Sequence, residues 1–247
     1  MKYLTLANSG TFPIWTTLLL GFVLGLRHAL DGDHLAAVST FASEEKNLWR
    51  SSLIGVYWGL GHTTALLVFG MAIAVFRLAV SPRLSQALEF AVGVMLVLLG
   101  ANVIRKLLRG DKVHVHSHTH DGSTHSHWHF HVFSAEHGHA HHVLRVGGGR
   151  PFVVGVVHGL AGTAAIMLMV VGAIPSLLLA CGYIVIFGIG SIGGMMLMST
   201  LMSVPLALAA RRVSLVERGI RLAAGLFSVG FGIFLAWDVG LLQSLLG

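Results

Sequence analysis

The sequence predicts an all-α membrane protein with six transmembrane helices, arranged as two inverted repeats of three helices. Apolar residues make up 55% of the chain and charged residues only 11%, whereas soluble domains carry about a quarter charged residues. The mean hydropathy is +0.79. Several apolar runs reach the roughly 20 residues that one bilayer span requires, and polar or turn-forming segments separate them. These observations exclude an ordinary soluble domain.

The expected spans follow the apolar runs in order. The first and fifth runs are longer than one perpendicular helix needs at ~1.5 Å per residue, so we expect these two to be tilted or broken. The break points are predicted at Asp-Gly-Asp, residues 31–33, and at the glycine-rich residues 188–194. The six spans cover residues 13–41, 52–76, 84–104, 151–173, 177–208 and 219–239.

The basic residues predict the orientation of these spans. Twelve of the sixteen Lys and Arg residues fall on one side of the six-span arrangement and three on the other. Because the cytoplasmic side carries the excess of basic residues, we expect both termini outside and the long central loop in the cytoplasm. Nothing in this charge pattern indicates nucleic-acid binding. The single cysteine, Cys181, leaves neither a disulfide framework nor a cysteine-based metal site.

The two halves of the chain resemble each other. Residues 25–34 align with residues 155–164, which pairs His28 with His158, and an alignment of the next spans pairs His62 with Ser191. Three spans separate each pair, and three is odd, so the halves would have opposite orientations. Secondary transporters commonly use such an inverted repeat, with the substrate site near the midplane.

A histidine-rich loop, residues 110–150, separates the first repeat, residues 1–109, from the second, residues 151–247. Its His-x-His steps with Gly, Ser and Thr cannot build a core, so we expect it to be disordered when metal-free. Imidazoles in this pattern predict an accessory site that chelates Ni²⁺, Co²⁺, Zn²⁺ or Cu²⁺ weakly; a linker of fortuitous composition is the alternative. The loop histidines are His114, His116, His118, His120, His125, His127, His129, His131, His137, His139, His141 and His142.

Ionisable residues inside the first span indicate a metal site. A charge near the bilayer centre costs roughly 2.5–3.5 kcal/mol, so a cluster of charges suggests a pathway, a pair or a bound ion. Imidazole with carboxylate oxygen suits Ni²⁺, Co²⁺, Zn²⁺ or Cu²⁺ better than Ca²⁺ or Mg²⁺. On a continuous helix, His28, Asp31 and His34 would lie along one face and Asp33 would point away from it. Asp33 can therefore join the other three only if the helix breaks at Gly32. The predicted ligands are His28, Asp31, Asp33, His34, His62 and His158.

Structural alternatives remain for some of these residues. Asp31 could serve as a simple ion-pair partner of Arg27, four residues away on the helix. A lone histidine in a membrane helix is often an interhelical hydrogen bond, which is an equal alternative for His62 and for His158.

Residues 27–34, Arg-His-Ala-Leu-Asp-Gly-Asp-His, resemble the His-x4-Asp-His motif of the nickel/cobalt transporter family, and residues 60–70 are similar to that family's next conserved span. Family members usually have eight spans, Asp-Ala-Asp-His where this chain has residues 31–34, and an acidic fifth-span motif that is absent here. The chain is therefore more similar to the shorter UreH-type branch, which is associated with nickel supply to urease.

The resemblance implies a secondary permease of the plasma (inner) membrane and not an enzyme. It would take up Ni²⁺, Co²⁺ or both as transported substrate, with no cofactor, and a urease or hydrogenase metallochaperone would receive the ion. Two alternatives stay open. One is nickel/cobalt efflux, because related efflux proteins also carry a His-rich cytoplasmic loop. The other is an intramembrane metalloenzyme, although the sequence lacks His-Glu-x-x-His.

Overall fold

The computed structural model describes residues 14–45, 47–76, 81–109, 117–120, 123–126, 148–161, 174, 176–209 and 214–239. Four of the described helices are long and apolar enough to cross a membrane, and a bent pair of helices would make a fifth span. The helical, multi-pass membrane architecture is therefore confirmed. The elements in chain order are α1 (Ile14–His28), α2 (Gly32–Ala42), α3 (Leu48–Phe76), α4 (Pro82–Leu108), β1 (Ser117–His120), β2 (Ser123–Ser126), α5 (Gly149–Leu160), α7 (Leu177–Ala209) and α8 (Ser214–Asp238).

The first predicted span is broken where the sequence indicated. α1 ends at His28, α2 begins at Gly32, and the two helices are bent by 56°. Asp31 precedes α2 in an extended conformation. A Cβ added to Gly32 would lie 2.7 Å from the ring of Phe231 on α8, so a larger residue there would require this ring to shift. Gly32 therefore lies both at the break between α1 and α2 and at a close contact between α2 and α8.

The second predicted break is absent, and this expectation was wrong. α7 is one continuous helix through residues 188–194. Its glycines in this stretch permit close packing: a Cβ at Gly190 would overlap the backbone carbonyl of Phe22 on α1, and a Cβ at Gly188 would overlap the side chain of Thr63 on α3. Here glycine shortens the distance between helices instead of interrupting one.

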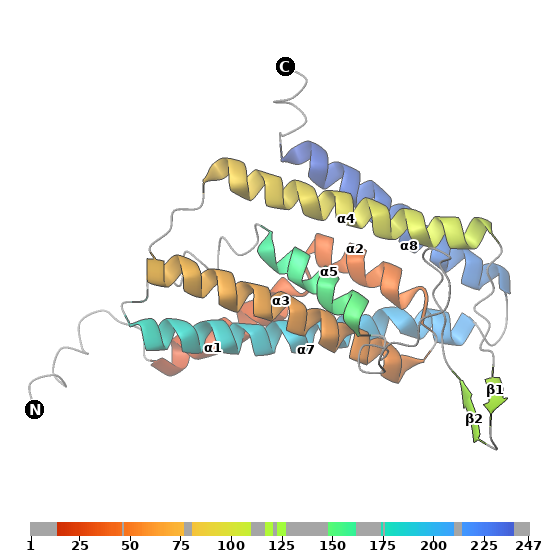
Figure 1. Ribbon diagram of the computed structural model, residues 1–247, viewed down its shortest axis with the longest axis horizontal. Helices are drawn as coiled ribbons and strands as arrows, with labels where there is room; N and C mark the ends of the chain where they lie inside the picture. The colour runs from red at the N-terminus through yellow and green to blue at the C-terminus, as the bar shows by residue number, and fades with distance from the viewer. Residues whose placement is uncertain are drawn as a thin grey trace, which may run out of the picture.

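The helices form two groups with shorter helices between them. α4 and α8 lie side by side, α1, α3 and α7 form the opposite group, and α2 and α5 lie between the two groups (Figure 1). Gly93 faces Gly232 and Gly100 faces Gly225 across the first contact. Because the residue numbers increase along α4 as those of the facing residues decrease along α8, the two helices are antiparallel.

The same kind of contact gives the directions of the other helices. On α3 and α7, Gly55 packs against Met195, whereas Gly188 packs against Thr63, so these helices are antiparallel. On α1 and α7, Gly21 packs against Tyr183 and Gly25 packs further along α7, so these helices are parallel.

α5 runs parallel to α3, since Gly155 packs against Trp58 and Gly159 against His62. α5 ends at Leu160, and the rest of the predicted fourth span, residues 162–173, lies outside the described residues. The fourth span of the prediction is therefore described only in its first half.

A buried serine cluster joins α3 to α7. The Ser51 hydroxyl donates to the Ser199 carbonyl over 2.7 Å, and the Ser199 hydroxyl donates to the Ser51 carbonyl over 2.6 Å. The Ser51 hydroxyl also contacts that of Ser203. Hydrogen bonds between membrane helices average about 0.6 kcal/mol, so this reciprocal pair fixes the register of α3 against α7.

Two short strands lie within the predicted histidine-rich loop. β1 and β2 form an antiparallel hairpin that pairs His118 with His125 and His120 with Ser123. The sequence pattern of the loop indicated no strand there. The rest of the loop, and with it the expectation of disorder there, lies outside the described residues.

Candidate metal centre

The break between α1 and α2 brings the predicted ligands together. His28 is the last residue of α1, and Asp33 and His34 stand in the first turn of α2. His62 comes from the middle of α3, and His158 from the last turn of α5. All four imidazoles are buried, with no more than 8% of any residue exposed. Four helices therefore contribute to one buried polar cluster.

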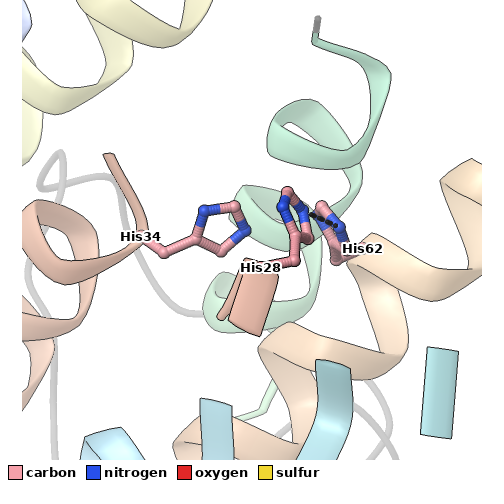
Figure 2. A group of neighbouring side chains, drawn as sticks. All are labelled: His28, His34 and His62. Atoms are coloured by element: carbon pink, nitrogen blue, oxygen red, sulfur yellow. Dashed lines mark hydrogen bonds between the residues drawn. The ribbon is translucent and has the colours of Figure 1, made fainter. Parts of the chain in front are cut away.

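His28 connects the cluster to Asp31 and to His62. The Nδ1–H of His28 donates to Oδ2 of Asp31 over 2.8 Å. This bond leaves Nε2 of His28 facing Nε2 of His62, 3.1 Å away, and Figure 2 shows these two rings side by side with His34 next to them. Asp31 therefore orients His28 toward the centre.

Asp33 connects the cluster to α5. Its Oδ1 accepts from the backbone N–H of His34 over 2.9 Å and lies 3.0 Å from the Nδ1 of the same residue. Its Oδ2 lies 2.9 Å from Nε2 of His158. Because Gly32 starts a new helix, Asp33 faces His158 instead of pointing away from the cluster, as the sequence required.

Two overlapping groups in this cluster have metal-ligand geometry. The first contains His28, His34 and His62, and the second contains Asp33, His34 and His158; in each group the potential ligand atoms all lie within 4.8 Å of one another. His34 belongs to both groups. Such nitrogen-rich donor sets suit Ni²⁺, Co²⁺, Zn²⁺ or Cu²⁺.

Three ring nitrogens in the cluster are buried without a hydrogen-bond partner in the described part of the chain: Nε2 of His34, Nδ1 of His62 and Nδ1 of His158. A buried unsatisfied polar atom costs about 1–3 kcal/mol. A transition-metal ion would use such a nitrogen lone pair as a ligand. The cluster therefore offers nitrogen lone pairs that a metal ion could use, in addition to its helix-to-helix hydrogen bonds.

The structure brings together five of the six predicted intramembrane ligands. Asp31 belongs to neither group, and its side chain is 41% exposed. Of the loop histidines, His118, His120 and His125 lie in the hairpin, and the other nine lie outside the described residues.

Two aromatic side chains that the sequence analysis missed border the cluster. The Phe187 ring lies 5.5 Å from that of His28, and the Trp58 ring lies 5.3 Å from that of His34 and 5.7 Å from that of His158, centroid to centroid. A signal was present, because Trp58 precedes His62 by four residues and Phe187 precedes Ser191 by four.

Ser191 is the residue that pairs with His62 when the two halves of the sequence are aligned. Its buried hydroxyl donates to the carbonyl of Gly25 over 3.2 Å. Ser191 therefore serves the packing of α1 on α7, and it belongs to neither group of potential ligands.

A bundle of apolar helices around a buried cluster of four histidines and one aspartate defines a multi-pass membrane protein with an intramembrane centre suited to a transition-metal ion. The chain is 38% identical over 232 residues to the urease accessory protein UreH of Bacillus sp. (strain TB-90), which covers 92% of this chain and 93% of that protein. The chain belongs to the UreH family, and the resemblance seen at residues 27–34 is confirmed.

More distant relatives match in part. The chain is 36% identical over 69 residues to a high-affinity nickel transport protein of Cupriavidus necator, over 28% of this chain and 20% of that protein. It is 25% identical over 194 residues to the chloroplast protein FOR GROWTH AND FERTILITY 1 of Arabidopsis thaliana, over 77% of this chain and 50% of that protein. The chain thus spans half the length of this chloroplast protein. No family model and no solved structure matches the chain.

Proposed function

We propose that this chain is a secondary transporter that takes up Ni²⁺, Co²⁺ or both across the plasma membrane. The observation that carries the proposal is the buried cluster in which His28, Asp33, His34, His62 and His158 converge from four helices. A site for a transported ion must be dry enough to strip the ion of water and must be built from elements that can separate. The similarity to a nickel transport protein supports nickel as the ion.

The proposal includes an architecture of two inverted repeats. α1 runs parallel to α7, α5 runs parallel to α3, and α3 and α7 are antiparallel. α1 and α5 therefore run in opposite directions, as the equivalent helices of an inverted repeat must. Gly25 packs on the carbonyl of Phe187, and Gly155 packs on the carbonyl of Trp58. The two contacts are equivalent in the alignment of the halves, which supports the repeat.

The orientation of the chain follows from its basic residues. With both termini outside, the histidine-rich loop of residues 110–150 is cytoplasmic. There it would collect the incoming ion and pass it to a urease or hydrogenase metallochaperone; the similarity to a urease accessory protein supports the first of these recipients. In this proposal the chain binds and releases its substrate unchanged, so it is not an enzyme.

Efflux is the second candidate, because a histidine-rich loop in the cytoplasm would equally deliver ions to an outward pathway. The direction of net flux separates the two functions. Cells that express the wild-type chain should accumulate radioactive nickel above the background of cells without it, and depletion below that background would establish efflux.

Variants of the cluster test the site. His28→Ala and Asp33→Asn should each abolish nickel accumulation at unchanged protein level, because each removes a ligand. Asp238→Asn is the matched control, since this aspartate is exposed at the end of α8, and it should transport normally. Normal transport by both cluster variants would show that the site is wrong. Deletion of residues 112–143 should reduce the rate of accumulation, and an unchanged rate would remove the loop from the pathway.

A further inference from the structure

We propose that the centre holds the transported ion at two alternative positions that share His34, so that the ion moves between them without leaving this imidazole. The first position is formed by His28, His34 and His62, and the second by Asp33, His34 and His158. That the bound ion is a transport substrate rests on the proposed function, whereas the two positions themselves follow from the geometry of the cluster.

The two edges of the His34 ring face different partners. Its Nδ1 is bonded to Asp33, on the side of the second position, and its Nε2 is buried without a partner in the described residues. Figure 2 shows one ring nitrogen of His34 directed toward His28 and the other directed away from it. Its ring centroid lies 4.4 Å from that of His28 and 4.2 Å from that of His158. His34 is therefore placed between the two groups.

The two positions have different aromatic neighbours. Phe187 contacts His28 of the first position and lies one turn before Ser191 on α7. Trp58 contacts His34, which both positions share, and His158 of the second position. An ion that moves from the first position to the second would therefore leave the side of Phe187 and approach Trp58 and α5.

The positions also differ in charge. The first offers three imidazoles and no anionic ligand, while the second includes the Asp33 carboxylate. A divalent cation interacts far more strongly with a carboxylate in a buried site than with neutral imidazole. The second position should therefore bind more tightly.

Only one position can be filled at a time. Both use the His34 ring, and two divalent ions a few ångströms apart in a buried site would repel each other strongly. The overall association constant is then the sum of the constants for the two positions. Loss of the weaker position barely changes the measured affinity, whereas loss of the stronger one lowers it to that of the position that remains.

The experiment is a Co²⁺ titration of the full purified chain in detergent, followed by calorimetry and by the visible absorption of bound Co²⁺. The double variant His28→Ala/His62→Ala keeps the second position and should bind one Co²⁺ with an affinity within about twofold of wild type, since the weaker position contributes less than half of the sum. The double variant Asp33→Asn/His158→Ala keeps the first position. It should bind one Co²⁺ more weakly by about 10- to 100-fold, with a changed absorption spectrum because the carboxylate is lost.

His34→Ala should reduce Co²⁺ binding more than either double variant, because it removes a ligand of both positions. If either double variant binds no Co²⁺, or if His34→Ala binds as wild type does, the inference is overturned, and the five residues act as a single site or not at all. Ser191→Ala, which removes a nearby hydrogen bond but no ligand, is the control for packing and should bind normally. His28→Gln replaces His28→Ala in the first variant if the latter fails to fold.

Flux measurements separate this inference from the proposed function. Neither double variant should transport Ni²⁺ in reconstituted vesicles, because each lacks one of the two positions between which the ion moves; this movement is called the relay below. If the wild-type chain moves no Ni²⁺ but the binding pattern above is found, the transport proposal fails and the two positions stand. If one double variant transports at the wild-type rate, the relay is refuted while transport stands.

Discussion

Asp31 should set the metal affinity of the centre without binding the metal. Its carboxylate accepts the Nδ1–H of His28 over 2.8 Å, and this contact both orients the ring and makes Nε2 the nitrogen that faces the cluster. A carboxylate in this position holds the tautomer and the orientation of the imidazole. We expect Asp31→Asn to weaken Ni²⁺ binding and Asp31→Ala to weaken it more.

The magnitude follows from what each substitution removes. Loss of such a partner typically costs 10- to 100-fold in metal affinity, which is about 1.4–2.8 kcal/mol. Asp31→Asn retains an oxygen that can accept the same hydrogen bond and loses only the charge. Because this side chain is 41% exposed, solvent already screens the effect of that charge on His28. We therefore expect about a tenfold loss for Asp31→Asn and a loss near 100-fold for Asp31→Ala.

The assay is a competition between the purified chain and a coloured chelator for Ni²⁺ at constant pH. Asp238→Asn, at an exposed position on α8, is the matched control and should keep the wild-type affinity. His28→Ala provides the scale for loss of a ligand. The interpretation of Asp31 as an orienting residue is refuted if Asp31→Ala binds like wild type, or if Asp31→Asn loses as much affinity as His28→Ala.

Two further predictions concern the packing of the bundle. Gly155→Ala places a methyl group on the backbone carbonyl of α3 and should destabilise the chain by about 1–3 kcal/mol, measured as a lower melting temperature in detergent. Gly219→Ala, where a Cβ meets nothing within 4 Å, should leave the melting temperature unchanged or raise it. Equal melting temperatures for the two variants would contradict the close approach of α5 to α3 at Gly155. Ser51→Ala, which breaks bonds from α3 to α7, should cost about 0.6–1.7 kcal/mol. Ser52→Ala should cost less, because its exposed hydroxyl bonds only within α3; the reverse order would refute the α3–α7 contact as a source of stability.

Most of the centre could be predicted from the sequence because ionisable residues inside an apolar span have few explanations. His28, Asp33 and His34 stood out for that reason, and Gly32 between them indicated the break that lets Asp33 turn inward. His62 and His158 were each open to a structural explanation as a single histidine. Only the fold shows that α3 and α5 bring both to the same place, since no local pattern encodes which helices are neighbours.

Other features could not be read from the chain because the same residue type serves two purposes. Glycine at residue 32 permits a break, whereas glycines at 188–194 permit close packing of an unbroken helix. The difference lies in the packing partner. Gly32, at the break, packs against the side chain of Phe231, whereas Gly190 packs against the backbone of α1. The aromatic borders of the centre were missed for a similar reason, because a phenylalanine or tryptophan in an apolar span is typical of ordinary packing.

In the proposed inverted repeat, the two halves share the candidate ligands unequally. The contacts of Gly25 and Gly155 are equivalent, so the two halves supply similar frames around the cluster. Only the first half keeps an acidic ligand, because Thr163 aligns with Asp33, and Ser191 aligns with His62. A symmetric frame with symmetric ligands would hold an ion equally well from either end of the bundle. Within the two proposed positions, an ion beside Phe187 therefore has three imidazole ligands, whereas an ion beside Trp58 also has the carboxylate of Asp33.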